Sequence, residues 1–423
     1  MQSPSSKAKI ALLLATMAFA ANFSVWVLYA VSGIQLKTDL GLSATEFGLL
    51  LSAPIFSGAI LRLPVGFLAE KYSAKKLYLL QMIVVLPPLI LLRNAQTLSD
   101  YLWLGLFLGI SGVSFTIGIR YVVDWFQSKH QGTVMGIFGA GNAGAAITLV
   151  LAPVIIDELG LSMLGPIYAG GMIFVILLFA FLAPETPEYI QSKNRINWKE
   201  HIEPLKHLKV WRFGLYYYFV FGSYLALTLW LPQYYVEAYQ LHINQAMALT
   251  LIFVASSSIV RAAGGWFADK YGARKVNWGV FWTCLICLFF LSYPPTTMVI
   301  KGVEREVNLS IEVNVWVFTW LIFIIGIAQG FGRASVYKVI YDNYPLKMGS
   351  VGGAVSMVGA LGGCTLPLAF GIAVDFIGVY SACFMLLYGV SAVCMFLMYL
   401  ANTKEQYQQR VKHAIETNFL ERD

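Results

Sequence analysis

Two stretches of the chain decide its fold. Residues 62–76 read RLPVGFLAEKYSAKK, and residues 261–275 read RAAGGWFADKYGARK. Seven of the fifteen aligned positions are identical, and the two stretches are 199 residues apart. Each stretch ends an apolar run and begins a basic loop. A weaker sequence similarity relates the segment that begins at Asp124 to the one that begins at Asp342. The sequence is therefore predicted to fold as two related halves.

The composition predicts a membrane protein. The 423 residues are 58% hydrophobic and 12% charged, with a mean hydropathy of +0.68, whereas a soluble domain carries about 25% charged residues. A transmembrane helix needs about 20 apolar residues. Windows of that kind, with uncertain edges, occur at residues 10–34, 45–68, 77–94, 101–123, 133–155, 165–184, 212–235, 246–268, 276–294, 313–336, 350–373 and 378–401.

The expected fold is an all-α membrane protein with twelve transmembrane helices, in two six-helix bundles related by pseudo-two-fold symmetry. Residues 1–184 would form the first bundle and residues 212–401 the second. Residues 185–211 would be a cytoplasmic central loop, and residues 402–423 a cytoplasmic tail. Repeated halves are typical of secondary transporters, which bind their substrate near the bilayer midplane between the repeats.

The distribution of charge predicts orientation. The formal net charge of +7 could suggest a nucleic-acid partner, but most of the 29 basic residues fall on the side of the membrane that holds the N-terminus. Basic loops stay in the cytoplasm, so we expect a multi-pass inner-membrane protein in contact with lipid, with both termini cytoplasmic and no nucleic acid bound. The first apolar run is too long for a secretory signal, so a retained first helix is expected.

Several site types are not expected. All five cysteines lie inside predicted spans, so the sequence predicts no disulfide framework, metal site or cofactor. No Asp or Glu lies in the interior of a predicted span, and none of the five histidines lies in a span. Without acids, histidines or a metal cluster at membrane depth, an enzyme is the least expected function.

Cations inside the predicted spans indicate an anion site, because an arginine at the centre of a membrane helix costs at least about 2.5–3.5 kcal/mol. Arg62 lies eight residues before Glu70, and Arg261 eight before Asp269, so both lie about 12 Å inside their helices. Related by the repeat, they would face each other across a central cavity, where an anion would relieve their repulsion. The alternative, pairing with buried carboxylates, lacks a carboxylate partner in the spans.

Two further arginines lie in predicted spans. Arg333 is nine residues before Asp342, a depth that could also reach the cavity, and we include it among the candidate substrate-binding residues. Arg120 is only four residues before Asp124, so its side chain could instead extend to the membrane interface.

The loop motif resembles that of the major facilitator superfamily. The residues that carry the resemblance are Gly66, Glu70, Lys71, Gly265, Asp269, Lys270 and Arg274. The resemblance implies a role in cytoplasmic gating. The acidic residue could cap the next helix or pair with a base, and the glycine would permit close helix contact.

The glycine-rich segment Gly139-Ala140-Gly141-Asn142-Ala143-Gly144 resembles the first signature of the nitrate/nitrite porter family. A purely structural explanation of this segment is that its small residues let neighbouring helices pack closely. The family resemblance implies that Asn142, Phe115, Tyr217 and Phe221 line the site with Arg62 and Arg261. The chain departs from the family at Arg333, where the family commonly has asparagine, at Arg120, where it commonly has proline, and in a second signature that is poorer in glycine.

The predicted function is therefore secondary transport of a small nitrate- or nitrite-type anion by alternating access. The lack of buried acids and histidines favours anion exchange, or proton movement only as part of a substrate–proton complex. One alternative is a porter of an organic carboxylate, which extra cations would suit. Another is a membrane anion sensor that does not transport. By analogy with its fold, the protein is expected to work as a monomer.

Overall fold

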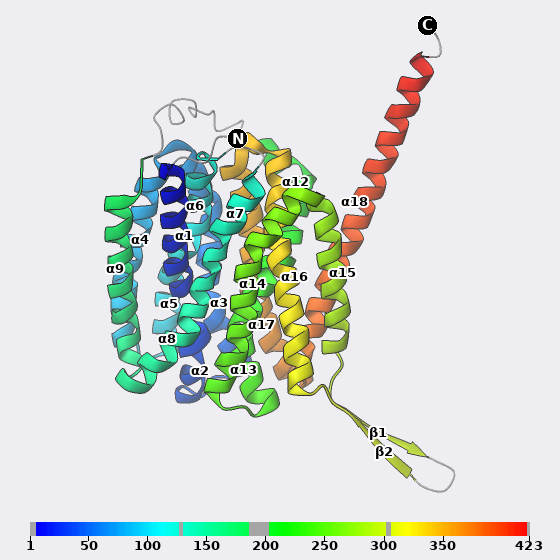
Figure 1. Ribbon diagram of the computed structural model, residues 1–423. Helices are drawn as coiled ribbons and strands as arrows, with labels where there is room; N and C mark the ends of the chain where they lie inside the picture. Colours follow the sequence, from blue (N-terminus) through cyan, green and yellow to red (C-terminus); the bar gives the residue numbers. More distant parts are fainter. Residues whose placement is uncertain (1–5, 127–129, 186–202, 302–305, 421–423) are drawn as a thin grey trace.

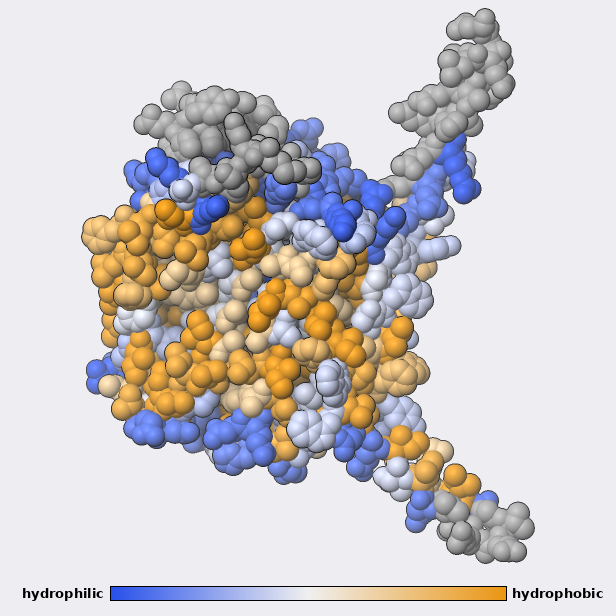
Figure 2. All heavy atoms as spheres, in the orientation of Figure 1, coloured by the Kyte–Doolittle hydropathy of each residue, from blue (hydrophilic) through white to orange (hydrophobic). Residues whose placement is uncertain are grey.

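The computed structural model describes residues 6–126, 130–185, 203–301 and 306–420. Both ends of the chain lie at one face of the helical body, here called the termini face (Figure 1). A two-stranded hairpin leaves the opposite face, here called the hairpin face. An apolar belt lies between two polar faces (Figure 2), as a membrane-spanning protein requires.

Twelve segments of the described chain are long and apolar enough to cross a membrane, which confirms the predicted all-α fold. In the first half they are α1 (Ser6–Trp26) with α2 (Tyr29–Asp39), α3 (Ala44–Lys71), α4 (Ala74–Leu91), α5 (Leu98–Leu108) with α6 (Ser114–Val123), α7 (Gln131–Gly139) with α8 (Gly144–Leu159), and α9 (Leu164–Leu182). In the second half they are α12 (Leu208–Tyr217) with α13 (Tyr224–Tyr239), α14 (Ile243–Tyr271), α15 (Ala273–Leu291), α16 (Val315–Asn343), α17 (Met348–Ile377) and α18 (Ala382–Leu420).

Local sequence sets where these helices begin. Ser43 and Glu46 form a capping box at the start of α3, in which the Glu46 carboxylate accepts from the Ser43 backbone N–H at 2.9 Å. The Asn314 side chain accepts from the backbone N–H of Trp316 at 2.8 Å and starts α16. Each cap satisfies an N–H group that the helix itself leaves unpaired.

The two halves meet along two helix pairs. In one pair α3 packs against α17, and in the other α14 packs against α7. The repeat arginines lie on α3 and α14, one from each half. The interface between the halves therefore holds Arg62 and Arg261, the pair predicted to bind an anion between them and called here the anion clamp.

Three regions outside the predicted spans take regular structure. Strands β1 (Thr296–Lys301) and β2 (Glu306–Ile311) pair antiparallel between α15 and α16, with Met298 opposite Leu309. At the end of the chain, α18 continues beyond the apolar span to Leu420, so the tail up to that residue is helical, as its polar sequence predicts. The helix after the central loop begins at Leu208, four residues earlier than predicted.

Candidate functional site

Arg62 is fully buried on α3, with 0% of its surface exposed. Its Nε donates to the carbonyl oxygen of Gly112 (3.0 Å), and its Nη1 donates to that of Ser356 in the other half (3.1 Å). Its Nη2 has no hydrogen-bond partner within the described residues. A buried charged donor without an acceptor is destabilising, so this nitrogen is available to an anion.

Arg261 has a matching environment on α14, with 1% of its surface exposed. Its Nη1 donates to the carbonyl oxygen of Gly139 in the other half (3.3 Å), and its Nη2 lies 3.5 Å from the Tyr217 hydroxyl. Its Nε is buried and has no partner in the described part of the chain. Each repeat arginine therefore binds a carbonyl across the interface and keeps one nitrogen free.

A wall of aromatic rings joins the two arginines. The guanidinium carbons of Arg62 and Arg261 lie 5.6 and 5.1 Å from the centre of the same Phe115 ring. Arg62 also lies 5.2 Å from Phe221 and 4.8 Å from Trp26. The Phe115 and Phe221 rings are nearly parallel, at 15°, with centres 6.5 Å apart. Flat rings beside cations stabilise positive charge and shape a narrow site.

Two tyrosines extend this wall. Tyr217 stacks on Phe221 with ring centres 5.1 Å apart, and Tyr337 meets Tyr217 edge-on at 4.9 Å. Tyr337 also meets Phe115 at 5.2 Å and donates to the carbonyl oxygen of Gly352 at 3.0 Å. Of the residues that the family resemblance proposed, the structure brings Phe115, Tyr217 and Phe221 together around the arginines.

Asn142 and Arg333 lie beside Arg261. Asn142 is fully buried, and its amide oxygen must face the two guanidiniums because both are donors; it accepts from Nη1 of Arg261 at 3.0 Å and from Nη1 of Arg333. Arg333 also donates through Nη2 to the Ser257 carbonyl (2.8 Å) and hydroxyl (2.6 Å). Its guanidinium carbon lies 3.7 Å from the centre of the Tyr224 ring. Protein acceptors thus already occupy much of Arg333.

Irregular helix geometry creates these contacts. The helices turn to 3₁₀ geometry at Gly109–Val113 and Ala140–Ala143, and to π geometry at Tyr218–Ser223. Such departures change the regular backbone pairing and are frequent at functional sites. The two 3₁₀ segments lie at or next to Gly112 and Gly139, whose carbonyl oxygens bind the two arginines, and the π segment contains Phe221.

Gly139 marks the closest approach of α7 to Arg261. A Cβ atom placed on Gly139 would lie 2.7 Å from Nη2 of Arg261, and nearer still to its Nε and Cζ. Real side chains do not come so close. The glycine-rich segment is thus required for the guanidinium to reach the backbone.

The site carries three buried cations and no described counter-charge. Arg62, Arg261 and Arg333 are each at most 1% exposed, and none pairs with a carboxylate among the described residues. In the described spans, each carboxylate lies in the first or last turn of its span. Buried charges are ordinarily paired, so the compensating charge is left for a bound anion to supply.

The first loop motif helps to seal the termini face. Glu70 accepts from the backbone N–H of Gly349 at the start of α17 (2.7 Å) and from Nε of Arg120 (3.2 Å). Arg120 also pairs with Asp124. A Cβ on Gly66 would lie 2.6 Å from the Gly349 carbonyl oxygen, so glycine permits this contact between helices. Glu70 therefore pairs with a base, which is one of the two expected roles, and it caps a helix of the other half and not the next helix in the chain.

The second loop motif repeats this arrangement. Asp269 accepts from the backbone N–H (2.9 Å) and the hydroxyl (2.8 Å) of Thr133 on α7. Lys338, the repeat counterpart of Arg120, lies 3.6 Å from Asp269. Gly265 packs directly against the backbone of Gly132. The two motifs thus hold the halves together at one face.

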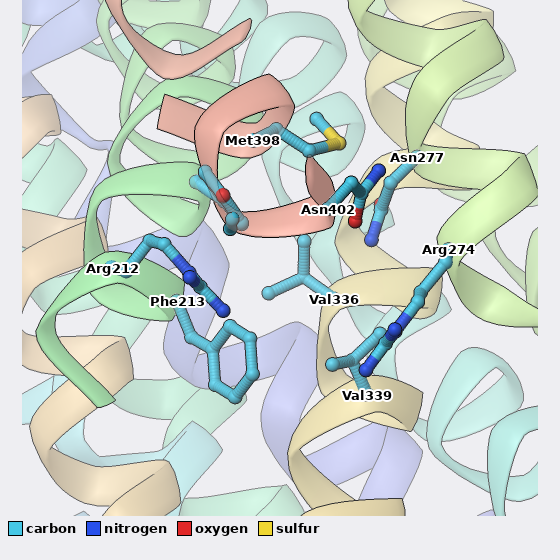
Figure 3. Close-up of a pocket in the computed structure, with 10 residues that line it drawn as sticks. Arg212, Phe213, Arg274, Asn277, Val336, Val339, Met398 and Asn402 are labelled. Atoms are coloured by element: carbon cyan, nitrogen blue, oxygen red, sulfur yellow. The ribbon is translucent and has the colours of Figure 1, made fainter. Parts of the chain in front are cut away.

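The remaining motif residues lie elsewhere on the termini face. Lys71 is 5.4 Å from the ring of Tyr72, and Lys270 is 4.7 Å from that of Trp266. Arg274 lines a small pocket inside the second half, together with residues of α12, α15, α16 and α18 (Figure 3). The labelled lining residues are Arg212, Phe213, Arg274, Asn277, Val336, Val339, Met398 and Asn402.

Sequence reasoning missed several residues of the arginine site. Trp26 and Tyr337 belong to its aromatic wall, and Tyr224 and Ser257 hold Arg333. Tyr337 follows Arg333 by four residues, a spacing that places both on one helix face and could have identified it. Among the described residues, no group of three or more His, Cys, Asp or Glu could hold a metal ion.

Comparisons with known proteins point in one direction. A sequence profile of the Major Facilitator Superfamily matches residues 14–304. The probable nitrate/nitrite antiporter NarK1 of Thermus thermophilus is 33% identical, over 96% of this chain and 94% of its own length. The nitrite extrusion protein of Bacillus subtilis (strain 168) is 29% identical over 97% of each chain. The solved human organic anion transporter MFSD10 (TETRAN) shares the fold, with a TM-score of 0.71 at 14% identity, over 94% of this chain and 100% of its own.

Proposed function

The chain belongs to the nitrate/nitrite porter family of the major facilitator superfamily, and we propose that it exchanges nitrate for nitrite across the inner membrane. The names of its relatives include a nitrate/nitrite antiporter and a nitrite extrusion protein. Transport would proceed by alternating access, with rocking of the helices of residues 1–184 against those of residues 212–401.

One observation carries this proposal: the two repeat arginines, one from each half, meet at the same ring with a free nitrogen each. Arg62 offers Nη2 and Arg261 offers Nε, and neither guanidinium pairs with a carboxylate among the described residues. Charge-assisted hydrogen bonds from arginine suit the oxygens of a small oxyanion. An anion held between them would contact both halves at once, so its binding would be coupled to their movement.

The surrounding residues favour a small, flat anion. Phe115 and Phe221 present nearly parallel rings beside Arg62. We propose that these rings and Tyr217 confine the anion, while Asn142 orients the guanidinium of Arg261. An organic carboxylate is less well supported, because the third cation, Arg333, already donates to Ser257 and Asn142.

Exchange is the favoured mode of coupling. Proton-driven carriers commonly use a buried carboxylate or histidine. In the described spans, the carboxylates lie in terminal turns, away from the arginines. We therefore propose a monomeric anion exchanger without enzymatic activity, whose termini face is cytoplasmic and is closed by the Glu70 and Asp269 caps.

The test is flux into vesicles that contain the purified protein. Uptake of ¹⁵N-nitrate is expected to require nitrite or nitrate inside, and a proton gradient is not expected to replace the internal anion. Formate, oxalate and larger carboxylates are expected to compete weakly. Uptake driven by a proton gradient into vesicles without internal anion would contradict exchange. Binding without flux under either condition would instead identify a sensor.

Arg333→Asn is expected to raise the half-saturation concentration for nitrate by about tenfold, because Asn142 loses one of its two donors and the site loses a charge. It should also weaken competition by the dianion oxalate more than competition by nitrite. The matched control is Ser257→Ala, which removes one hydroxyl contact and keeps the guanidinium. If Arg333→Asn leaves the preference among anions unchanged, Arg333 has only a structural role.

A further inference from the structure

The two halves meet at four corners, and at three of them a carboxylate caps the start of the facing helix. Glu70 and Asp269 make two of these caps, both at the termini face. The third is at the hairpin face, where Asp375 of α17 accepts from the backbone N–H (2.9 Å) and the hydroxyl (2.5 Å) of Thr45 at the start of α3. Three of four corners thus use the same contact.

The fourth corner lies between the end of α8 and the start of α14, also at the hairpin face. Asp157 and Asn244 line the same gap there, which has a volume of about 270 Å³. No hydrogen bond joins these two residues in the described structure. The backbone N–H of Asn244 reaches only the ring Nδ1 of His242, at a long 3.4 Å. The start of α14 therefore lacks the strong cap that its three counterparts have.

The internal repeat relates the open corner to the closed one. Thr45 and Asn244 are 199 residues apart, the same separation as Arg62 and Arg261. Asp157 and Asp375 are 218 residues apart, the same separation as Asp124 and Asp342. At the α8–α14 corner, Asp157 and Asn244 thus occupy the places that Asp375 and Thr45 occupy at the α3–α17 corner.

We propose that Asp157 is a positioning residue of the transport cycle, which caps the start of α14 when the halves close at the hairpin face. The first N–H groups of a helix lack internal partners and carry partial positive charge, and aspartate is among the best caps for them. In the present structure the α3–α17 corner is capped while the α8–α14 corner is open. When the α8–α14 corner closes, Asp157 caps the start of α14, and it leaves this position when the corner opens.

The lining of the gap suits closure. Val150, Val154 and Leu251 face the same gap as Asp157, and bringing α8 onto α14 would bury these side chains together. The neighbouring acid Glu158 does not line the gap. Glu158 therefore offers a matched control with the same charge on the same turn.

This inference rests on the part of the proposed function that makes the chain an alternating-access transporter, and not on the identity of the anion. A cross-link between Val154→Cys and Ala248→Cys, which line the gap from its two sides, reports closure without any substrate. The five native cysteines, all buried, are replaced first. The full-length protein in vesicles is oxidised, and the rate of disulfide formation is measured.

Asp157→Ala is expected to slow cross-linking about fivefold, the typical effect of removing one helix cap. Asp157→Asn should restore most of the rate, because asparagine caps nearly as well as aspartate, and Glu158→Ala should leave the rate unchanged. Equal rates for Asp157→Ala and the parent, or an equal loss in Glu158→Ala, would overturn the proposal. So would a parent that never cross-links, because the gap would then not close.

Discussion

Arg62→Lys and Arg261→Lys are each expected to reduce nitrate exchange by about 10- to 150-fold while the protein still inserts and folds. Lysine keeps the charge but loses the planar fork that lets arginine bind a carbonyl and an anion at once. Each arginine uses one guanidinium nitrogen to bind a backbone carbonyl of the other half, that of Ser356 for Arg62 and that of Gly139 for Arg261. Loss of one charge-assisted hydrogen bond, about 1.5–3 kcal/mol, gives the expected range.

The measurement is ¹⁵N-nitrate uptake into nitrite-loaded vesicles, normalised to the amount of folded protein. Arg93→Lys is the matched control, because Arg93 is exposed at the end of the third span and its replacement should leave uptake unchanged. Near-normal flux in both clamp variants would refute the anion clamp. A loss in only one of them would mean that a single half holds the anion.

Gly139→Ala is expected to abolish exchange almost completely. The added methyl group would occupy the position of the Arg261 guanidinium, with Nη2 only 2.7 Å away, so the arginine must leave its carbonyl partner and its contact with Asn142. Overpacking of this kind typically costs about 1–3 kcal/mol, and here the displaced group is the proposed ligand itself.

Gly171→Ala on α9 is the control for this substitution, since a methyl group there would meet nothing within 4 Å. Two readouts separate site from stability: exchange, and the rise in melting temperature that nitrate produces. Gly139→Ala should lose both, while its melting temperature without nitrate should fall by only a few degrees, the size that overpacking predicts. If nitrate still stabilises Gly139→Ala as it does the parent, Arg261 does not need this backbone contact.

The sequence was sufficient for the spans and for the arginine pair, because a charge in an apolar run is conspicuous and this one occurs in both halves. It could not show which aromatic residues face inward. Buried membrane helices are apolar on all sides, so their periodicity does not reveal a face. Phe115, Tyr217 and Phe221 came from family resemblance, and Trp26, which the resemblance did not include, was missed.

Contacts between distant segments were beyond the sequence for a different reason. The short spacing from Arg120 to Asp124 placed Arg120 near the interface, but nothing local indicated Glu70, 50 residues away, as a second partner. The β1–β2 hairpin was also not predicted. Its signal is modest: Met298, Val299 and Ile300 form a short apolar run flanked by Thr297 and Lys301, which is much weaker than the long apolar runs of the spans on either side.

The three buried arginines have a consequence for the step in which the carrier returns without an anion. Passage from one side to the other goes through a state in which Arg62, Arg261 and Arg333 are all shut away from water. Without a bound anion, that state would hold three uncompensated positive charges, and the desolvation penalty of each is several kcal/mol. A bound anion would offset part of this penalty, so the loaded protein would cross between the two sides more readily than the empty one, as anion exchange requires.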